Sequence, residues 1–167
     1  MKAPVPIKRD KNLVLLSRDH HDGLLLVWKI RQGIKLNADR ALITKYIVNV
    51  FDNELELHFN EEESLLFNQL PVIDELRIKA EDQHAAIRKK IAAFRSSEIY
   101  SDADLLSFAL LLEEHIRFEE RTLFPYLEKM IPGKLLEEIG KQLEKDHAAK
   151  ECLVWNEEFW IKGNRVK

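Results

Sequence analysis

The sequence has few of the residues that interrupt helices or cross-link small folds. Gly and Pro number five each among 167 residues, and Cys152 is the single cysteine. One cysteine cannot form an internal disulfide, which agrees with a reducing compartment. No apolar run approaches the length of a membrane span, and no apolar segment follows the basic residues of the N-terminal "MKAPVPIKRDKN". We therefore expect a cytoplasmic protein that does not associate with membranes, and we expect Cys152 to be a small buried hydrophobe on a helix.

An excess of charge of one sign is also lacking. A third of the residues are charged, yet the formal net charge is only -3. The chain therefore has neither the basic surface typical of nucleic-acid binding nor an acidic tail, and we expect no nucleic-acid partner. Its length fits one domain, residues 1–167, with a core large enough to fold without a disulfide or a structural metal.

Apolar residues at helical spacing are abundant. They recur with a period near 3.6, and no segment alternates apolar and polar residues as a half-buried strand would, so the sequence predicts an all-α fold. Short connections place neighbouring helices antiparallel, which predicts an up-down-up-down four-helix bundle over about residues 12–130, with a fifth helix packed outside it or at a homodimer contact. The expected helices span about residues 12–36, 39–70, 73–95, 101–130 and 135–160.

One segment of the chain occurs twice. The segment "HFNEEESLLFNQL", which begins at His58, aligns without a gap with "HIRFEERTLFPYL", which begins at His115. Both copies contain a His, two adjacent Glu, a Leu-Phe pair and a final Leu. On a helix the fourth residue after a His is rotated by roughly 40° from it, so Glu62 faces the same way as His58, and Glu119 the same way as His115. Both pairs continue apolar stripes and should face the core.

Two further histidines lie in the apolar stripes of the other two helices. His84 continues the core spacing of the third expected helix, and His20 continues that of the first. His21 is turned roughly 100° away from His20 and is assigned to a supporting contact or a dimer surface. A small rotation of the first helix would exchange these two residues, so this alternative stays open.

These buried polar residues need a common explanation. A single His or Glu on an apolar face is more often an ordinary core or surface residue, but two ionised carboxylates in a dry core cost several kcal/mol unless a positive charge compensates them. Imidazoles and carboxylates that converge inside a bundle are typical ligands of first-row metal ions. The candidate metal ligands are His20, His58, Glu62, His84, His115 and Glu119.

The other candidates in these segments are given smaller roles. Glu61, Glu63 and Glu120 should point outward as ordinary surface charge. His147 lies on the fifth expected helix without an HxxxE partner, so it is assigned a supporting or structural role. No residue is assigned as catalytic.

The ordered set of His, HxxxE, His and HxxxE resembles the hemerythrin-like (HHE cation-binding) domain family. The resemblance covers about Leu13 to Met130 and includes the "LFP" that follows the second HxxxE. It implies a non-haem di-iron centre with the four histidines as terminal ligands and with Glu62, Glu119 and an oxo or hydroxo group as bridges. It also implies oxygen, nitric oxide or peroxide as the small ligand. Manganese and zinc stay alternatives, because the same ligands accept them.

Two positions depart from the oxygen carriers of that family. Arg88 stands where those carriers have a second His on the third helix, and their second carboxylate corresponds to Glu120. Glu119 is preferred here, because a fifth residue is rotated roughly 140° from the His. One histidine fewer leaves a coordination position open, which suits a binder or sensor of oxygen or a related diatomic. The alternatives are a redox enzyme acting on peroxide or nitric oxide, and a protein of iron storage or repair.

A metal-free function is the remaining alternative. The aromatic residues Trp155, Phe159 and Trp160 would make the fifth helix the docking surface of a helical interaction module. Large apolar residues at that spacing more often seat a helix on its own bundle.

Overall fold

The structure is a computed structural model that describes residues 8–97 and 100–162. These residues form helices and contain no strand, so the all-α prediction is confirmed. Most of the N-terminal "MKAPVPIKRDKN" lies outside the described residues.

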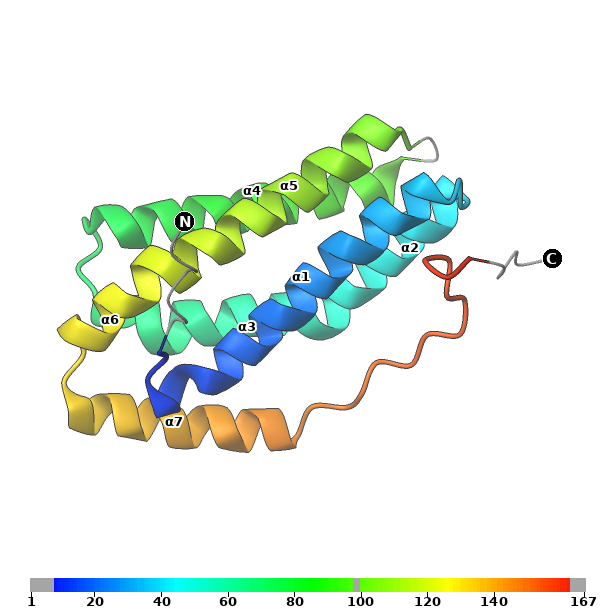
Figure 1. Ribbon diagram of the computed structural model, residues 1–167. Coiled ribbons are helices and arrows are strands. Elements are labelled where there is room, and N and C mark those ends of the chain that lie inside the picture. The colour runs from blue at the N-terminus through cyan, green and yellow to red at the C-terminus, as the bar shows by residue number, and fades with distance from the viewer. Residues whose placement is uncertain (1–7, 98–99, 163–167) are drawn as a thin grey trace, which may run out of the picture.

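Four long helical segments lie side by side (Figure 1). The first and third are nearly uninterrupted α-helices, whereas π-helical turns interrupt the second and fourth. In chain order the elements are η1 (Lys11–Leu13) and α1 (Val14–Lys35); α2 (Arg40–Val50), η2 (Phe51–Leu55), α3 (Glu56–Glu61), η3 (Glu62–Leu66) and η4 (Phe67–Gln69); α4 (Glu75–Ser96); α5 (Asp102–Phe118), η5 (Glu119–Leu123) and α6 (Phe124–Met130); and finally α7 (Gly133–Ala148).

The helix ends follow local sequence signals. Asp74 accepts hydrogen bonds from the backbone N–H groups of Leu76 and Arg77 at the start of α4. Ser101 and Asp104 form a reciprocal capping box at the start of α5. Pro71 follows the last turn of the second long segment, where the backbone becomes extended.

Two apolar clusters fill the interior, and a layer of histidines lies between them. Phe59 and Phe108 belong to one cluster, and Phe67 and Phe124 belong to the other. The ring of His84 stacks on Phe59 with 3.8 Å between centroids and on Phe67 with 5.6 Å. The apolar cores therefore hold the imidazole in place from both sides.

The helix α7 covers one side of the bundle. It runs beside α1 and α3 in Figure 1, and its buried residues Leu136, Ile139 and Leu143 join the second apolar cluster. The fifth helix therefore exists, as expected, and packs on the protein's own core.

The predicted extent of that helix, to about residue 160, is wrong. The helix ends at Ala148, and the chain continues without regular secondary structure to a turn at Phe159. Lys150 donates a hydrogen bond to Asp19, whereas Phe159 lies against Gly33. Asp19 and Gly33 both belong to α1 and are roughly 21 Å apart along the helix axis. A helix between Lys150 and Phe159 would span only about 14 Å, while an extended chain spans about 30 Å.

We call residues 149–162 the C-terminal strap, because they return along α1 to the far end of the bundle (Figure 1). Cys152 lies in the strap and is exposed, so its expected burial on a helix is wrong for the same geometric reason. No helix formed by the described residues combines the length and the apolar character that crossing a bilayer requires.

Candidate metal centre

The structure brings all six candidate ligands together in the interior. The two carboxylates are fully buried, at 0% exposure, and the four histidines are also buried. The carboxylates lie between two pairs of imidazoles: His20 with His58, and His84 with His115. The Nε2 atoms are 3.0 Å apart in the first pair and 3.2 Å apart in the second.

Each carboxylate approaches histidines of both pairs. In Glu62, Oε1 lies 3.1 Å from Nε2 of His58, and Oε2 lies 3.3 Å from Nε2 of His84. In Glu119, Oε2 lies 3.0 Å from Nε2 of His20 and 3.3 Å from that of His115. The potential donor atoms therefore form two groups that share both carboxylates: His20 and His58 with the two Glu, and His84 and His115 with the same two Glu.

The four imidazoles are all oriented in the same sense. Each Nε2 points to the centre, and each Nδ1 lies within hydrogen-bond distance of an oxygen on the outer side. The Nδ1 partners are Glu120 for His20 at 2.7 Å, Asp19 for His58 at 3.1 Å, Glu63 for His84 at 2.7 Å and Gln83 for His115 at 3.1 Å. Carboxylate oxygens and the amide oxygen of Gln83 only accept, so each Nδ1–H donates to its partner, and Nε2 can present its lone pair to a metal ion.

These acceptors follow a cyclic order around the bundle. Asp19, on the first long segment, accepts from His58 on the second, and Glu63 on the second accepts from His84 on the third. Gln83 and Glu120 continue the cycle to the fourth segment and back to the first. Every acceptor is the chain neighbour of a candidate ligand, so each helical segment fixes the imidazole of the next.

The expected outward orientation of Glu63 and Glu120 is therefore wrong. The carboxylate of Glu120 accepts hydrogen bonds from Arg9 and Ser17. The carboxylate of Glu63 accepts one from Nη1 of Arg88 at 2.7 Å. The signal that could have identified them is the pair of adjacent Glu in both copies of the repeat: the first Glu faces the centre, and the second reaches the Nδ1 of a neighbouring helix.

Glu61 is also engaged, through the C-terminal strap. Its Oε2 accepts from Nζ of Lys150 at 3.2 Å, so this residue is not a free surface charge. His147 donates from Nε2 to Asp19 at 2.9 Å and is separated from His58 by that carboxylate. This agrees with a supporting role for His147. His21 is exposed, whereas His20 belongs to the cluster.

The electrostatics of the centre are unbalanced. Burial raises the pKa of Glu62, but His58, His20 and His84 outweigh it and hold this pKa well below its usual range. Burial and the neighbouring charge of Glu62 raise the pKa of Glu119 to about 7. Ionised Glu62 thus makes ionisation of the neighbouring Glu119 unfavourable. A cation between the two carboxylates would remove this repulsion.

The donor set fits a pair of first-row metal ions. None of the four oxygens of Glu62 and Glu119 has a hydrogen-bond partner, and four inward imidazole lone pairs surround them. Two nitrogens bound to one ion at about 2.1 Å and at right angles lie roughly 3 Å apart, which is the spacing within each His pair. Bridging carboxylates between imidazoles are the usual way in which a helical bundle holds two metal ions.

The backbone changes at both carboxylates. Glu62 is the first residue of the π-helical turn η3, and Glu119 is the first residue of η5. Single π-helical turns inside α-helices occur frequently at functional sites. Periodicity at 3.6 residues per turn did not predict them.

The fold and this cluster define a helical protein with a buried site suited to metal cations. The comparison with protein families agrees: the model described as Hemerythrin HHE cation binding domain matches residues 16–127. The chain belongs to this family, and the resemblance noted in the sequence is confirmed. A search of the curated proteins and a search of the solved structures give no match.

Proposed function

We propose that this protein holds two iron ions in the centre and binds or senses oxygen, or a related small diatomic such as nitric oxide, there. His20 and His58 would hold one ion, His84 and His115 the other, and Glu62 and Glu119 would bridge them. A pair of iron ions in such a site supplies reversible redox chemistry and a coordination position at which a small ligand can exchange.

The observation that carries this proposal is the convergence of two fully buried carboxylates and four buried imidazoles on one point. Four carboxylate oxygens without a hydrogen-bond partner lie among four Nε2 atoms, while each Nδ1 has its own acceptor outside. The chain therefore supplies lone pairs and negative charge to the centre. Its residues orient the imidazoles, and the Phe59, Phe67 and Phe124 rings that stack on them exclude water.

Arg88 supports a binder with an open coordination position. It stands where the oxygen carriers of the family have a further His, and it donates instead to Glu63 and Glu56. The site thus has four histidines. A redox enzyme acting on peroxide or nitric oxide is the alternative use of the same centre, and steady turnover with a reductant would favour it.

The interaction module receives no support from the strap. Phe159 is buried, and Trp155, Phe159 and Trp160 all contact the ring of Tyr46 on the protein's own bundle. The proposal also includes an antiparallel up-down-up-down order of the four long segments and a cytoplasmic location. A homodimer through α7 stays a prediction.

Two substitutions test the ligand assignment. His58→Ala and His115→Ala each remove one Nε2 from a different half of the centre, so each should lower the iron bound per chain while the far-UV circular dichroism stays helical. Undiminished iron in both variants would overturn the assignment.

A further inference from the structure

A cavity lies beside one half of the centre. It has a volume of about 480 Å³ and lies between α1, the end of α2 with η2, and the C-terminal strap. His58 is the one candidate ligand among its lining residues, and Asp19, which accepts from Nδ1 of His58, lies next to it. The cavity therefore reaches the outer, Nδ1 side of His58, in the half of the centre formed by His20 and His58.

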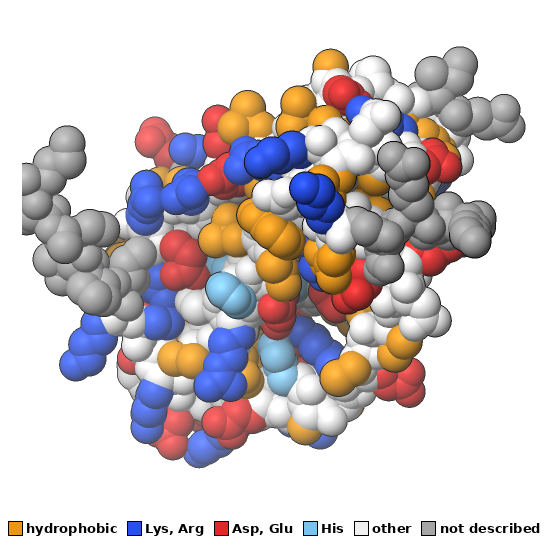
Figure 2. Space-filling model, turned by 45° about the vertical axis from the view of Figure 1, so that its right-hand side comes forward, with side chains coloured by type: hydrophobic (Ala, Val, Ile, Leu, Met, Phe, Trp, Pro, Cys, Tyr) orange, Lys and Arg blue, Asp and Glu red, His pale blue; other side chains and the backbone are white. Residues whose placement is uncertain are grey.

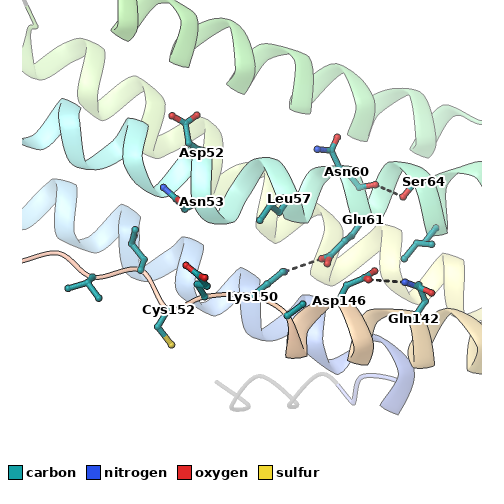
Figure 3. Close-up of a pocket in the computed structure, with 15 residues that line it drawn as sticks. Asp52, Asn53, Leu57, Asn60, Glu61, Ser64, Gln142, Asp146, Lys150 and Cys152 are labelled. Atoms are coloured by element: carbon teal, nitrogen blue, oxygen red, sulfur yellow. Dashed lines mark hydrogen bonds and ion pairs between the residues drawn. The ribbon is translucent and has the colours of Figure 1, made fainter.

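The strap forms the outer wall of this cavity and is fixed at both ends. Near its start, Nζ of Lys150 lies 3.2 Å from Asp19 and 3.2 Å from Glu61. Near its end, Phe159 occupies the space beside Gly33, where a Cβ atom would lie 2.6 Å from the ring. Figure 3, a close-up of the neighbouring pocket between α3, α7 and the strap, shows the first part of the strap, with Lys150 directed at Glu61 and the sulfur of Cys152 directed away from α3. Cys152 lines the cavity and is exposed.

The charges of the cavity are predominantly negative. Its lining contains five carboxylates, on Asp19, Asp22, Glu54, Glu151 and Glu158, and two ammonium groups, on Lys29 and Lys150. Both ammonium groups are engaged: Lys29 donates to the hydroxyl of Tyr46 at 2.7 Å and lies 4.0 Å from the ring centre of Trp160, and Lys150 is paired with Asp19 and Glu61.

The environment of Glu54 shows the effect of these charges. Burial, and then the charges of Asp22 and Asp19, raise the pKa of its carboxyl group and outweigh the opposing charges of Lys29 and Lys150. A negative potential confined between low-dielectric walls opposes the approach of anions far more than that of neutral molecules.

The face shown in Figure 2 is hollowed, and acidic and basic side chains surround the hollow.

We propose that this cavity is the route by which the exogenous ligand reaches the centre, and that it admits small uncharged molecules and slows anions. This inference rests on the proposed function, because it concerns access of the small ligand to the same site. It assigns to the strap the role of an outer wall that restricts access.

The single cysteine allows a test without mutating the cavity. A bulky maleimide on Cys152 should obstruct the cavity, whereas the small methylthio group from methyl methanethiosulfonate should leave it passable. With the ferrous protein in a stopped-flow experiment, we expect the bulky adduct to slow nitric-oxide association by about tenfold or more and the small adduct to leave the rate unchanged. The matched control carries Cys152→Ser and Ser107→Cys, which places the same bulky label on the exposed outer face of α5.

A double substitution tests whether the carboxylates of the cavity slow the entry of anions. Asp22→Asn with Glu54→Gln removes two carboxylates and should speed azide association with the ferric protein by at least about threefold, with little change for nitric oxide. An unchanged nitric-oxide rate in the bulky Cys152 adduct, with labelling verified by mass, would overturn the route. Equal acceleration of both ligands would overturn the selectivity.

A measurement on the metal-free protein separates this inference from the proposed function. Trp155 and Trp160 line the cavity, so in a Trp28→Phe background acrylamide should quench their fluorescence and iodide should do so much less. The bulky label on Cys152 should reduce the acrylamide quenching. Failure to bind iron with weak iodide quenching would overturn the proposed function and leave the charge-selective cavity standing, whereas equal quenching by iodide and acrylamide would overturn the acidic cavity whatever the metal content.

Discussion

Glu62 and Glu119 occupy matching positions in the two copies of the repeat. Each is the fourth residue after a histidine, each begins a π-helical turn, and each is fully buried. Their carboxylates belong to both groups of potential metal ligands. The repeat thus supplies two equivalent halves of one centre, and the backbone departs from α-helical geometry in both halves at the same residue.

The two adjacent histidines of α1 should behave differently. His20→Ala removes a buried imidazole whose Nε2 lies 3.0 Å from Glu119, so bound metal per chain should fall. His21→Ala changes an exposed side chain and should leave the metal content unchanged. Plasma mass spectrometry of the two purified variants makes the comparison, and the opposite result would place His21 in the centre.

The outer acceptors should tune metal affinity. Glu63→Gln removes the charge that holds Nδ1 of His84 at 2.7 Å, which should weaken metal binding by about tenfold while the stoichiometry is retained. A competition titration with a chromophoric chelator measures the affinity. Glu114→Gln is the matched control, because Glu114 is exposed beside His115. Equal affinity in both variants would show that the charge of Glu63 does not matter.

The cap of α4 should contribute to stability in a pH-dependent way. Asp74→Ala should lower the free energy of unfolding by about 1 kcal/mol, because it removes the acceptor for two backbone N–H groups. Asp74→Asn keeps an acceptor but loses the charge.

The sign of the pH effect follows from the pKa of Asp74. Burial raises this pKa, but the backbone N–H groups of Arg77 and Leu76 and the hydroxyl of Tyr126 together outweigh it, so the pKa is lowered in the folded protein. The stability from the charge is therefore present above the unfolded value of about 3.9 and is lost as the pH falls through the folded pKa. Urea unfolding should show wild type more stable than Asp74→Asn at neutral pH and the difference vanishing in acid. A pH-independent difference would contradict this.

The anchor of the strap should matter for stability. Phe159→Ala empties a buried aromatic position and should cost about 3 kcal/mol or more. Gly33→Ala should cost about 1–3 kcal/mol, because the added methyl group would meet that ring. Gly133→Ala, with no atom within 4 Å of the added Cβ, is the matched control and should not destabilise the protein. Denaturant unfolding of the three variants tests this order, and a neutral Phe159→Ala would show that the strap is not anchored there.

Much of this architecture could be predicted from residue spacing. A period of 3.6 located the helices, and His84 could be placed in the core because it continues an unbroken apolar stripe. Because burial of uncompensated charged groups is unfavourable, the histidines and carboxylates of the four expected helices could then be assigned to one site. These features could be predicted because each depends on one helix and on the side of it that faces inward.

The features that spacing did not predict depend on distances between elements. Glu63 and Glu120 were assigned to the surface because their own helices turn them outward, yet each reaches the Nδ1 of an imidazole on a neighbouring helix. The strap was expected to be helical because its apolar residues suit a helix, yet Phe159 must reach Gly33, which only an extended chain allows. Neither relation can be read from one segment alone.

The most direct test of the proposed di-iron centre is the metal content of untagged protein that has been exposed to neither a chelator nor a nickel resin, measured by plasma mass spectrometry. We expect about two iron ions per chain, shared between the two histidine pairs. A folded, helical protein that contains no stoichiometric metal and does not take up added ferrous ion would contradict this expectation, and the buried histidines and carboxylates would then serve the structure alone.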